Sequence, residues 1–258
     1  MGSRSANHPK PMHRPNLNER QRRILKFVVE SHVLKAEPVG SQYVRVAYHL
    51  SISPATIRSA MKRLEEEGLL DHPHTSAGRV PTEAGYRYYV DCLMEPEPIT
   101  PATRRALDRE VRQWSGATVD VQTLAVQLLA RSSHQLAMLT VPPSGDFPER
   151  RLRLGGAENI AAQPEFQTAD RLRALVTLLA QPEPLTRALD CFLDSASARI
   201  TIGRELGEGA MRACSLVGTG IASGHIRGSL GVLGPERMPY PRLLSLVSYV
   251  GERLAELE

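Results

Sequence analysis

The sequence predicts an α+β protein built in two parts. Helical periodicity dominates the first hundred residues, whereas strands and helices mix without regular alternation in the remainder. An acidic, proline-rich run at 95–98 separates the two parts. We therefore expect a polar tail at 1–16, a first domain at 17–98, two linker helices with a shortened middle at 99–150, and a second domain at 151–258.

The composition is that of a folded protein outside the membrane. Hydrophobic residues make up 41% of the chain and charged residues 23%, and no apolar run is long enough to span a bilayer. The tail at 1–16 lacks the apolar stretch of a signal peptide, so we expect a cytoplasmic location. The three cysteines, Cys92, Cys191 and Cys214, are widely spaced, which argues against a disulfide framework and a zinc site.

No catalytic chemistry stands out in the sequence. We find no nucleophile with a nearby base, no carboxylate pair and no metal cluster at useful spacing. His72 and His74 form a short pair without carboxylate or thiol partners, which favours polar loop residues over metal ligands. We therefore expect no enzyme activity, no cofactor and no metal.

Positive charge is unevenly placed along the chain. The net charge is +4, and the whole excess lies in the first 94 residues, together with six of the eight histidines. The remaining residues are close to neutral. This asymmetry is typical of a protein whose first part binds a polyanion, although many folded domains carry similar charge without binding nucleic acid.

The first part has the element order of a winged helix. Helices are expected at 17–34, 44–50 and 54–67, followed by a strand at 69–70, a turn-rich loop, a second strand and a helix from the cap residue Thr82 to Met94. Ser53 is placed as the N-cap of the third helix, with Pro54 as its first residue. Three helices followed by a hairpin favour DNA binding over an ordinary amphipathic surface helix.

The third expected helix has two different faces. Its apolar residues follow helical spacing and should face the core: Ile57, Ala60, Met61 and Leu64. The opposite face is small, polar and basic, which suits a helix that enters the major groove of DNA. The predicted DNA-binding residues are Ser53, Thr56, Arg58, Ser59, Lys62 and Arg63 on this helix, and His74, Thr75, Ser76 and Arg79 on the hairpin.

Different residues of this set suit different contacts. Arg58 can offer two hydrogen bonds to guanine, whereas Lys62 and Arg63 lie later in the helix and suit phosphates. The small residues near the start of the helix allow close approach to bases. Arg79 is surrounded by small residues and is expected in a minor groove or on a phosphate.

The second part mixes both element types. Helices are expected at 101–114, 119–131, 169–180, 185–193 and 240–257. Strands are expected at 152–154, 199–202, 215–222 and 226–233, the last two joined by a turn at Ser223 and Gly224. This order predicts an α+β domain rather than a parallel sheet.

Several strings resemble the HrcA heat-inducible transcription repressors of bacteria. In the first part these are EPVGS at 37–41, SPATIR at 53–58, LEEEGLL at 64–70 and HTSAGRVPTEAGYR at 74–87. In the second part they are GGAENI at 155–160, PEF at 164–166, SLV at 215–217 and GVLGPERMPY at 231–240. The hairpin string is long and unusual, which makes the resemblance specific.

The resemblance implies a negative regulator of chaperone operons. Proteins of this family have a winged helix, a GAF-like domain and an inserted dimerising domain. They bind an inverted-repeat operator called CIRCE as dimers, in the nucleoid, and the GroE chaperonin keeps them active until misfolded protein titrates it on heat shock. Double-stranded operator DNA, a second copy of the chain and GroE are the partners that this resemblance implies.

This chain departs from the family in the middle. Only 132–151 stands between the linker helices and the GGAENI string, so the inserted domain is expected to be missing. This leaves three modes of switching open: the chaperonin, direct melting by heat, or a small molecule bound by the GAF-like domain. A ligand-gated winged-helix regulator is therefore the alternative function.

Overall fold

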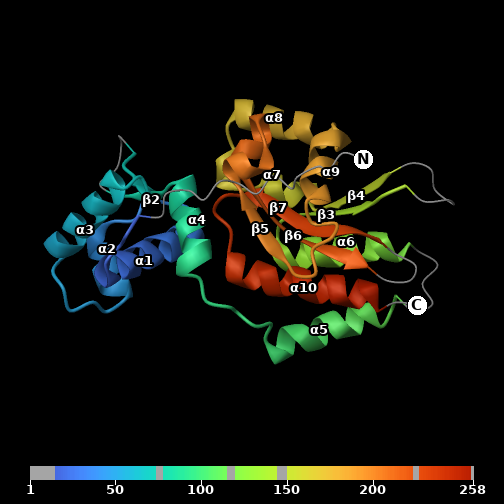
Figure 1. Ribbon diagram of the computed structural model, residues 1–258, viewed down its shortest axis with the longest axis horizontal. Helices are drawn as coiled ribbons and strands as arrows, with labels where there is room; N and C mark the ends of the chain where they lie inside the picture. Colours follow the sequence, from blue (N-terminus) through green and yellow to red (C-terminus); the bar gives the residue numbers. More distant parts are fainter. Residues whose placement is uncertain (1–14, 74–77, 115–119, 144–149, 223–226, 257–258) are drawn as a thin grey trace, which may run out of the picture. The chain divides into compact units, whose positions relative to one another are not determined.

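The chain folds into two compact units. The computed structural model describes residues 15–73, 78–114, 120–143, 150–222 and 227–256. Its units are Met1–Leu93 and Met94–Glu258 (Figure 1). None of the described helices is both long and apolar enough to cross a membrane.

The first unit is the winged helix that the sequence predicts. Its elements are α1 (Glu19–Lys35), α2 (Ser41–Ala47), α3 (Pro54–Glu66), β1 (Leu70–Asp71), β2 (Val80–Pro81) and α4 (Glu83–Cys92). The helices α1 and α2 both pack against α3, and β1 pairs with β2 in antiparallel register (Figure 1). The hairpin that follows α3 is the wing.

Local capping explains where these helices begin. The Asn18 side chain accepts from the Gln21 amide, and the Gln21 side chain accepts from the Asn18 amide, which forms a capping box at the start of α1. The helix α2 begins at Ser41, three residues before the predicted start. Gly40 takes the capping position with extended backbone, and the Ser41 side chain is buried within the helix.

The second unit is built on one antiparallel sheet. Its helices are α5 (Pro101–Val111), α6 (Val121–Ser133), α7 (Ala157–Ala161), α8 (Ala169–Leu179), α9 (Pro182–Asp190) and α10 (Tyr240–Ala255), with 3-10 turns at Pro164–Phe166, Gly203–Leu206 and Gly209–Ala213. Its strands are β3 (Leu136–Val141), β4 (Arg151–Gly155), β5 (Arg199–Ile202), β6 (Cys214–Ala222) and β7 (Arg227–Pro235). The sheet order is β4-β3-β7-β6-β5.

Helices cover both faces of this sheet. The helices α6 and α10 pack on one face, and α7 and α9 pack on the other, with α8 beside α9 (Figure 1). A core of buried side chains joins the sheet to α8 and α9, and its members include Leu136, Met138, Leu175, Leu189 and Phe192. The predicted α+β class is confirmed, and helices over an antiparallel sheet match the GAF-like domain that the resemblance implies.

The strand β3 was not predicted, although it lies inside the sheet. All six of its residues are buried, so it has no alternation of polar and apolar residues. It pairs with β4 on one side and β7 on the other. A domain that started at residue 151, as expected, would leave out β3 although β3 pairs with β4 and β7. The strand β3 therefore belongs to the second unit, which begins at Met94. Residues 142–150 alone connect β3 to β4.

Candidate nucleic-acid interface

The start of α3 is fixed by its cap. The Ser53 Oγ atom accepts from the Thr56 amide at 3.1 Å and lies 2.9 Å from Thr56 Oγ1. Pro54 occupies the first turn, where its missing N–H leaves no unmet donor. Both hydroxyls therefore hold the helix start, and they lie beside the remaining amides of the first turn, which favour anions.

The helix α3 has the two faces that the sequence predicts. Ile57, Ala60, Met61 and Leu64 are buried against the rest of the unit. Arg58, Ser59 and Lys62 are exposed, and none of their side chains has a hydrogen bond or ion pair within the described residues. Arg63 is also exposed and donates to Glu66 at 3.1 Å. The arrangement presents two cations and a small hydroxyl to the surroundings.

The tip of the wing lies outside the described residues. This applies to His74, Thr75 and Ser76, the three hairpin residues that were expected to approach DNA. The base of the wing is well defined, with Leu70 opposite Pro81 and Asp71 opposite Val80.

Arg79 lies at the base of the wing and contacts α3. Its Nε atom donates to Glu65 Oε2 at 2.8 Å, and only 16% of its side chain is exposed. Its backbone forms both hydrogen bonds of a bridge to Val39, at 2.8 Å and 3.0 Å. Arg79 thus joins the wing to α3 and to the segment before α2.

Two glycines allow the backbone to pack closely around this point. A Cβ atom on Gly78 would lie 2.6 Å from the carbonyl carbon of Pro38. A Cβ atom on Gly85, in the first turn of α4, would lie 2.1 Å from the carbonyl oxygen of Leu69. Larger residues at either position would push backbone against backbone. The wing is therefore held between α3, α4 and the segment that precedes α2.

Sequence reasoning missed Glu65 and Val39 as partners of Arg79. Glu65 is one of three consecutive glutamates, and nothing in the string singles it out. Glu65 and Arg79 meet because the hairpin folds back on α3, which requires the tertiary structure.

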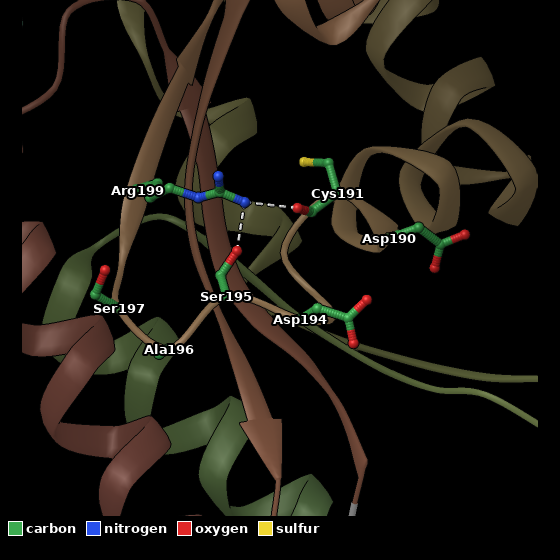
Figure 2. A pocket seen from close by; sticks show the side chains of 7 residues that line it. All are labelled: Asp190, Cys191, Asp194, Ser195, Ala196, Ser197 and Arg199. Atoms are coloured by element: carbon green, nitrogen blue, oxygen red, sulfur yellow. Dashed lines mark hydrogen bonds between the residues drawn. The ribbon is translucent and has the colours of Figure 1, made fainter. Parts of the chain in front are cut away.

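The second unit has a shallow polar hollow of about 260 Å³ beside β5 (Figure 2). The Arg199 guanidinium lies across it and donates to Cys191 O at 2.8 Å and to Ser195 Oγ (Figure 2). The Cys191 thiol points to Ala188 O, and burial raises the pKa of that thiol. The charged groups that line the hollow already have partners, because Asp190 pairs with Arg150 and Asp194 with Arg227, so the hollow offers little to a ligand. Among the described residues, no group of three or more His, Cys, Asp or Glu could hold a metal.

Comparisons with known proteins identify the family. Residues 144–244 match a family model described as the HrcA protein C terminal domain. A heat-inducible transcription repressor HrcA from Moorella thermoacetica is 30% identical, over 93% of this chain and 97% of the relative. One from Symbiobacterium thermophilum is 29% identical, over 93% and 98%. The chain belongs to the HrcA family of heat-inducible transcription repressors. This is a family of regulators rather than enzymes.

The alignments also bear on the shortened middle of this HrcA chain. The match to the Moorella HrcA runs over 339 positions, although it takes in 93% of only 258 residues here. Part of the relative therefore has no counterpart in this chain. A crystal structure described as a hypothetical protein at 2.2 Å resolution shares the fold, with a TM-score of 0.73, 21% identity, and 93% of this chain and 98% of that chain covered.

Proposed function

We propose that this HrcA chain is a dimeric repressor that binds an inverted-repeat operator of the CIRCE type and thereby lowers the transcription of chaperone operons. The exposed basic face of α3 is the observation that carries the proposal. Arg58, Ser59 and Lys62 lie together on a helix whose other side is buried. A helix of this kind fits the major groove of B-DNA, which is about 12 Å wide.

The predicted residues divide into direct contacts and supports. Arg58 is proposed to read guanine, with Ser59 beside it, while Lys62 and Arg63 contact phosphates. Ser53 and Thr56 orient the helix start and offer their hydroxyls to the backbone of DNA. His74, Thr75 and Ser76 remain proposed contacts of the wing. Arg79 is proposed to act mainly by positioning the wing, because Glu65 already binds its guanidinium.

Binding to the inverted repeat follows from two-fold symmetry. A dimer presents two copies of α3, and each copy reads one arm of the operator. The repressor would act in the cytoplasm, at the nucleoid when bound. Membership of the HrcA family supports the heat-inducible part of the proposal, and we propose that the GroE chaperonin and temperature modulate the activity.

Equilibrium binding across a salt series tests the operator claim. The full chain is titrated onto a CIRCE duplex and onto a scrambled duplex of equal length and composition. We expect tighter binding to CIRCE at every salt concentration, and a steep fall in both affinities as salt rises, because bound cations displace counterions from phosphate. Equal affinity for the two duplexes would overturn sequence-specific repression.

A second measurement separates the modes of switching. Binding to CIRCE is followed as temperature rises, with and without the GroE chaperonin. Modulation by GroE predicts that the chaperonin raises the active fraction of repressor. If operator affinity falls with temperature in the same way in both samples, the chaperonin part of the proposal is wrong and the chain itself senses heat.

A further inference from the structure

One side of the second unit carries exposed apolar side chains. Among the described residues of this unit, the exposed large hydrophobic side chains are Leu154, Leu172 and Val176, with 38%, 40% and 58% of each accessible. One lies on β4 and the other two on α8, on the same side of the sheet. Exposed apolar side chains that gather on one side of a protein commonly mark an interaction site.

Helix geometry joins these residues into one patch. Leu172, Val176 and Leu179 follow one another at spacings of four and three residues, so they share one side of α8. Leu179 also lines a groove of about 740 Å³ together with Leu152 and Leu154 of β4. We call these five residues, Leu152, Leu154, Leu172, Val176 and Leu179, the α8–β4 patch.

The sheet register explains why the leucines of β4 are only partly covered. Leu154 lies opposite Met138, and Leu152 lies opposite Thr140, so both leucines share the face of the sheet that α9 covers. Because β4 is the edge strand, the helices reach only partly over it. In the sequence, β4 directly follows the short connection where this chain was expected to lack the family's inserted domain.

Charges beside the patch suit a second copy of the chain. Glu183 and Arg187 of α9 both line the groove and are four residues apart, on one side of the helix. If two copies meet with their α9 helices antiparallel about a two-fold axis, each Glu183 faces the Arg187 of the other copy. The same surface then complements itself in charge and in apolar character, as a two-fold interface requires.

We propose that the α8–β4 patch and the groove beside it form the dimer interface of this chain. Two copies pack α8 and α9 across a two-fold axis, which buries Leu154, Leu172 and Val176 and pairs Glu183 with Arg187. The interface supplies the pairing that the chain's shortened middle does not. The inference rests on the proposed operator binding only for the need for two-fold symmetry.

Sedimentation of the full chain tests this interface without DNA. We expect a dimer for the wild type at micromolar concentration and a rise of about tenfold or more in the dimer dissociation constant for Val176→Asp. Ala174→Asp is the matched control, because it places the same charge on an exposed position two residues away, on another side of α8. Circular dichroism checks that both variants remain folded, as expected for exposed positions.

Charge reversal provides a second set of variants that leaves the apolar residues in place. Glu183→Arg and Arg187→Glu should each weaken the dimer, because like charges then meet across the axis. The double variant should restore most of the dimer. A monomeric wild type, equal dissociation of Val176→Asp and Ala174→Asp, or a double variant weaker than both single variants would overturn the proposed interface.

Operator binding by the same variant distinguishes a failure of the interface from a failure of the proposed function. Val176→Asp should bind a duplex with one operator arm as tightly as the wild type does, and should lose the added affinity that the second arm provides. If the wild type shows no preference for the operator but Val176→Asp still dissociates the dimer, the proposed function fails and the interface stands. If Val176→Asp remains a dimer and loses binding to another protein instead, the interface proposal is wrong.

Discussion

The Nε atom of Arg79, at the base of the wing, donates to Glu65 Oε2 on α3 at 2.8 Å. This ion pair connects the two elements that are proposed to contact DNA. Only 16% of the Arg79 side chain and 34% of the Glu65 side chain are exposed, so the pair is partly shielded from solvent. The position of the wing relative to α3 therefore depends on a contact that neither element forms alone.

Breaking this pair should loosen the wing. We expect Arg79→Ala and Glu65→Ala each to lower the free energy of unfolding by about 1–3 kcal/mol, because the remaining partner loses a charged hydrogen bond. The double variant should cost less than the sum of the single variants. Urea denaturation of the four proteins gives the coupling energy, and strict additivity would show that the pair contributes nothing.

Arg58 should carry base discrimination. Replacing it with Ala is expected to reduce the preference for CIRCE over a scrambled duplex by about 1–3 kcal/mol. Arg58→Lys is the control, since lysine keeps the charge but lacks the planar fork of guanidinium. Both variants should lose discrimination in competition binding, whereas an unchanged ratio for Arg58→Ala would place the reading residue elsewhere.

Lys62 should contribute affinity without specificity. We expect Lys62→Ala to weaken binding to operator and scrambled duplexes by similar factors, and to reduce the slope of log affinity against log salt by about one. Titrations at several salt concentrations measure both effects. A loss confined to the operator would instead assign Lys62 to a base.

Any side chain at Gly85 should destabilise the first unit. In Gly85→Ala the new Cβ atom would meet the Leu69 carbonyl, which lies 2.1 Å away, so α4 and the wing must shift apart. We expect a loss of about 1–3 kcal/mol in the free energy of unfolding. Gly40→Ser is the matched control, because no atom lies within 4 Å of a Cβ there and serine suits the N-cap position. Similar melting temperatures for the two variants would contradict this packing.

Cys214 should be inert in the folded protein. Burial, and then the charge of Glu236, raise the pKa of its thiol to about 12, so very little of the reactive thiolate forms at pH 8. In a Cys92→Ser, Cys191→Ser background, labelling by a thiol reagent should begin only as the second unit unfolds. Labelling in native buffer at the rate of an exposed cysteine would show that the thiol is accessible.

The sequence predicts the reading helix well because its signals are local. The Ser53 cap, Pro54 and the spacing of Ile57, Ala60, Met61 and Leu64 all act within one helix, and the structure has them as predicted. Strand β3 was missed because burial on both faces removes the alternation that marks a strand.

The contacts between elements required the structure. The pair between Arg79 and Glu65 joins the wing to α3, and Val176 is exposed because it lies on a side of α8 away from the buried Leu175 and Leu178. Helical spacing shows which apolar residues share one side of a helix, but it does not show whether another element packs on that side.

Hydroxyl-radical footprinting of the full chain on a CIRCE duplex tests the central claim most directly. The account predicts protection in both arms of the operator, related by the two-fold axis of the repeat. It also predicts that Arg58→Ala loses this pattern at a protein concentration where it still binds DNA without sequence preference. Uniform protection along the duplex, or the same pattern on a scrambled duplex, would contradict sequence-specific reading by α3.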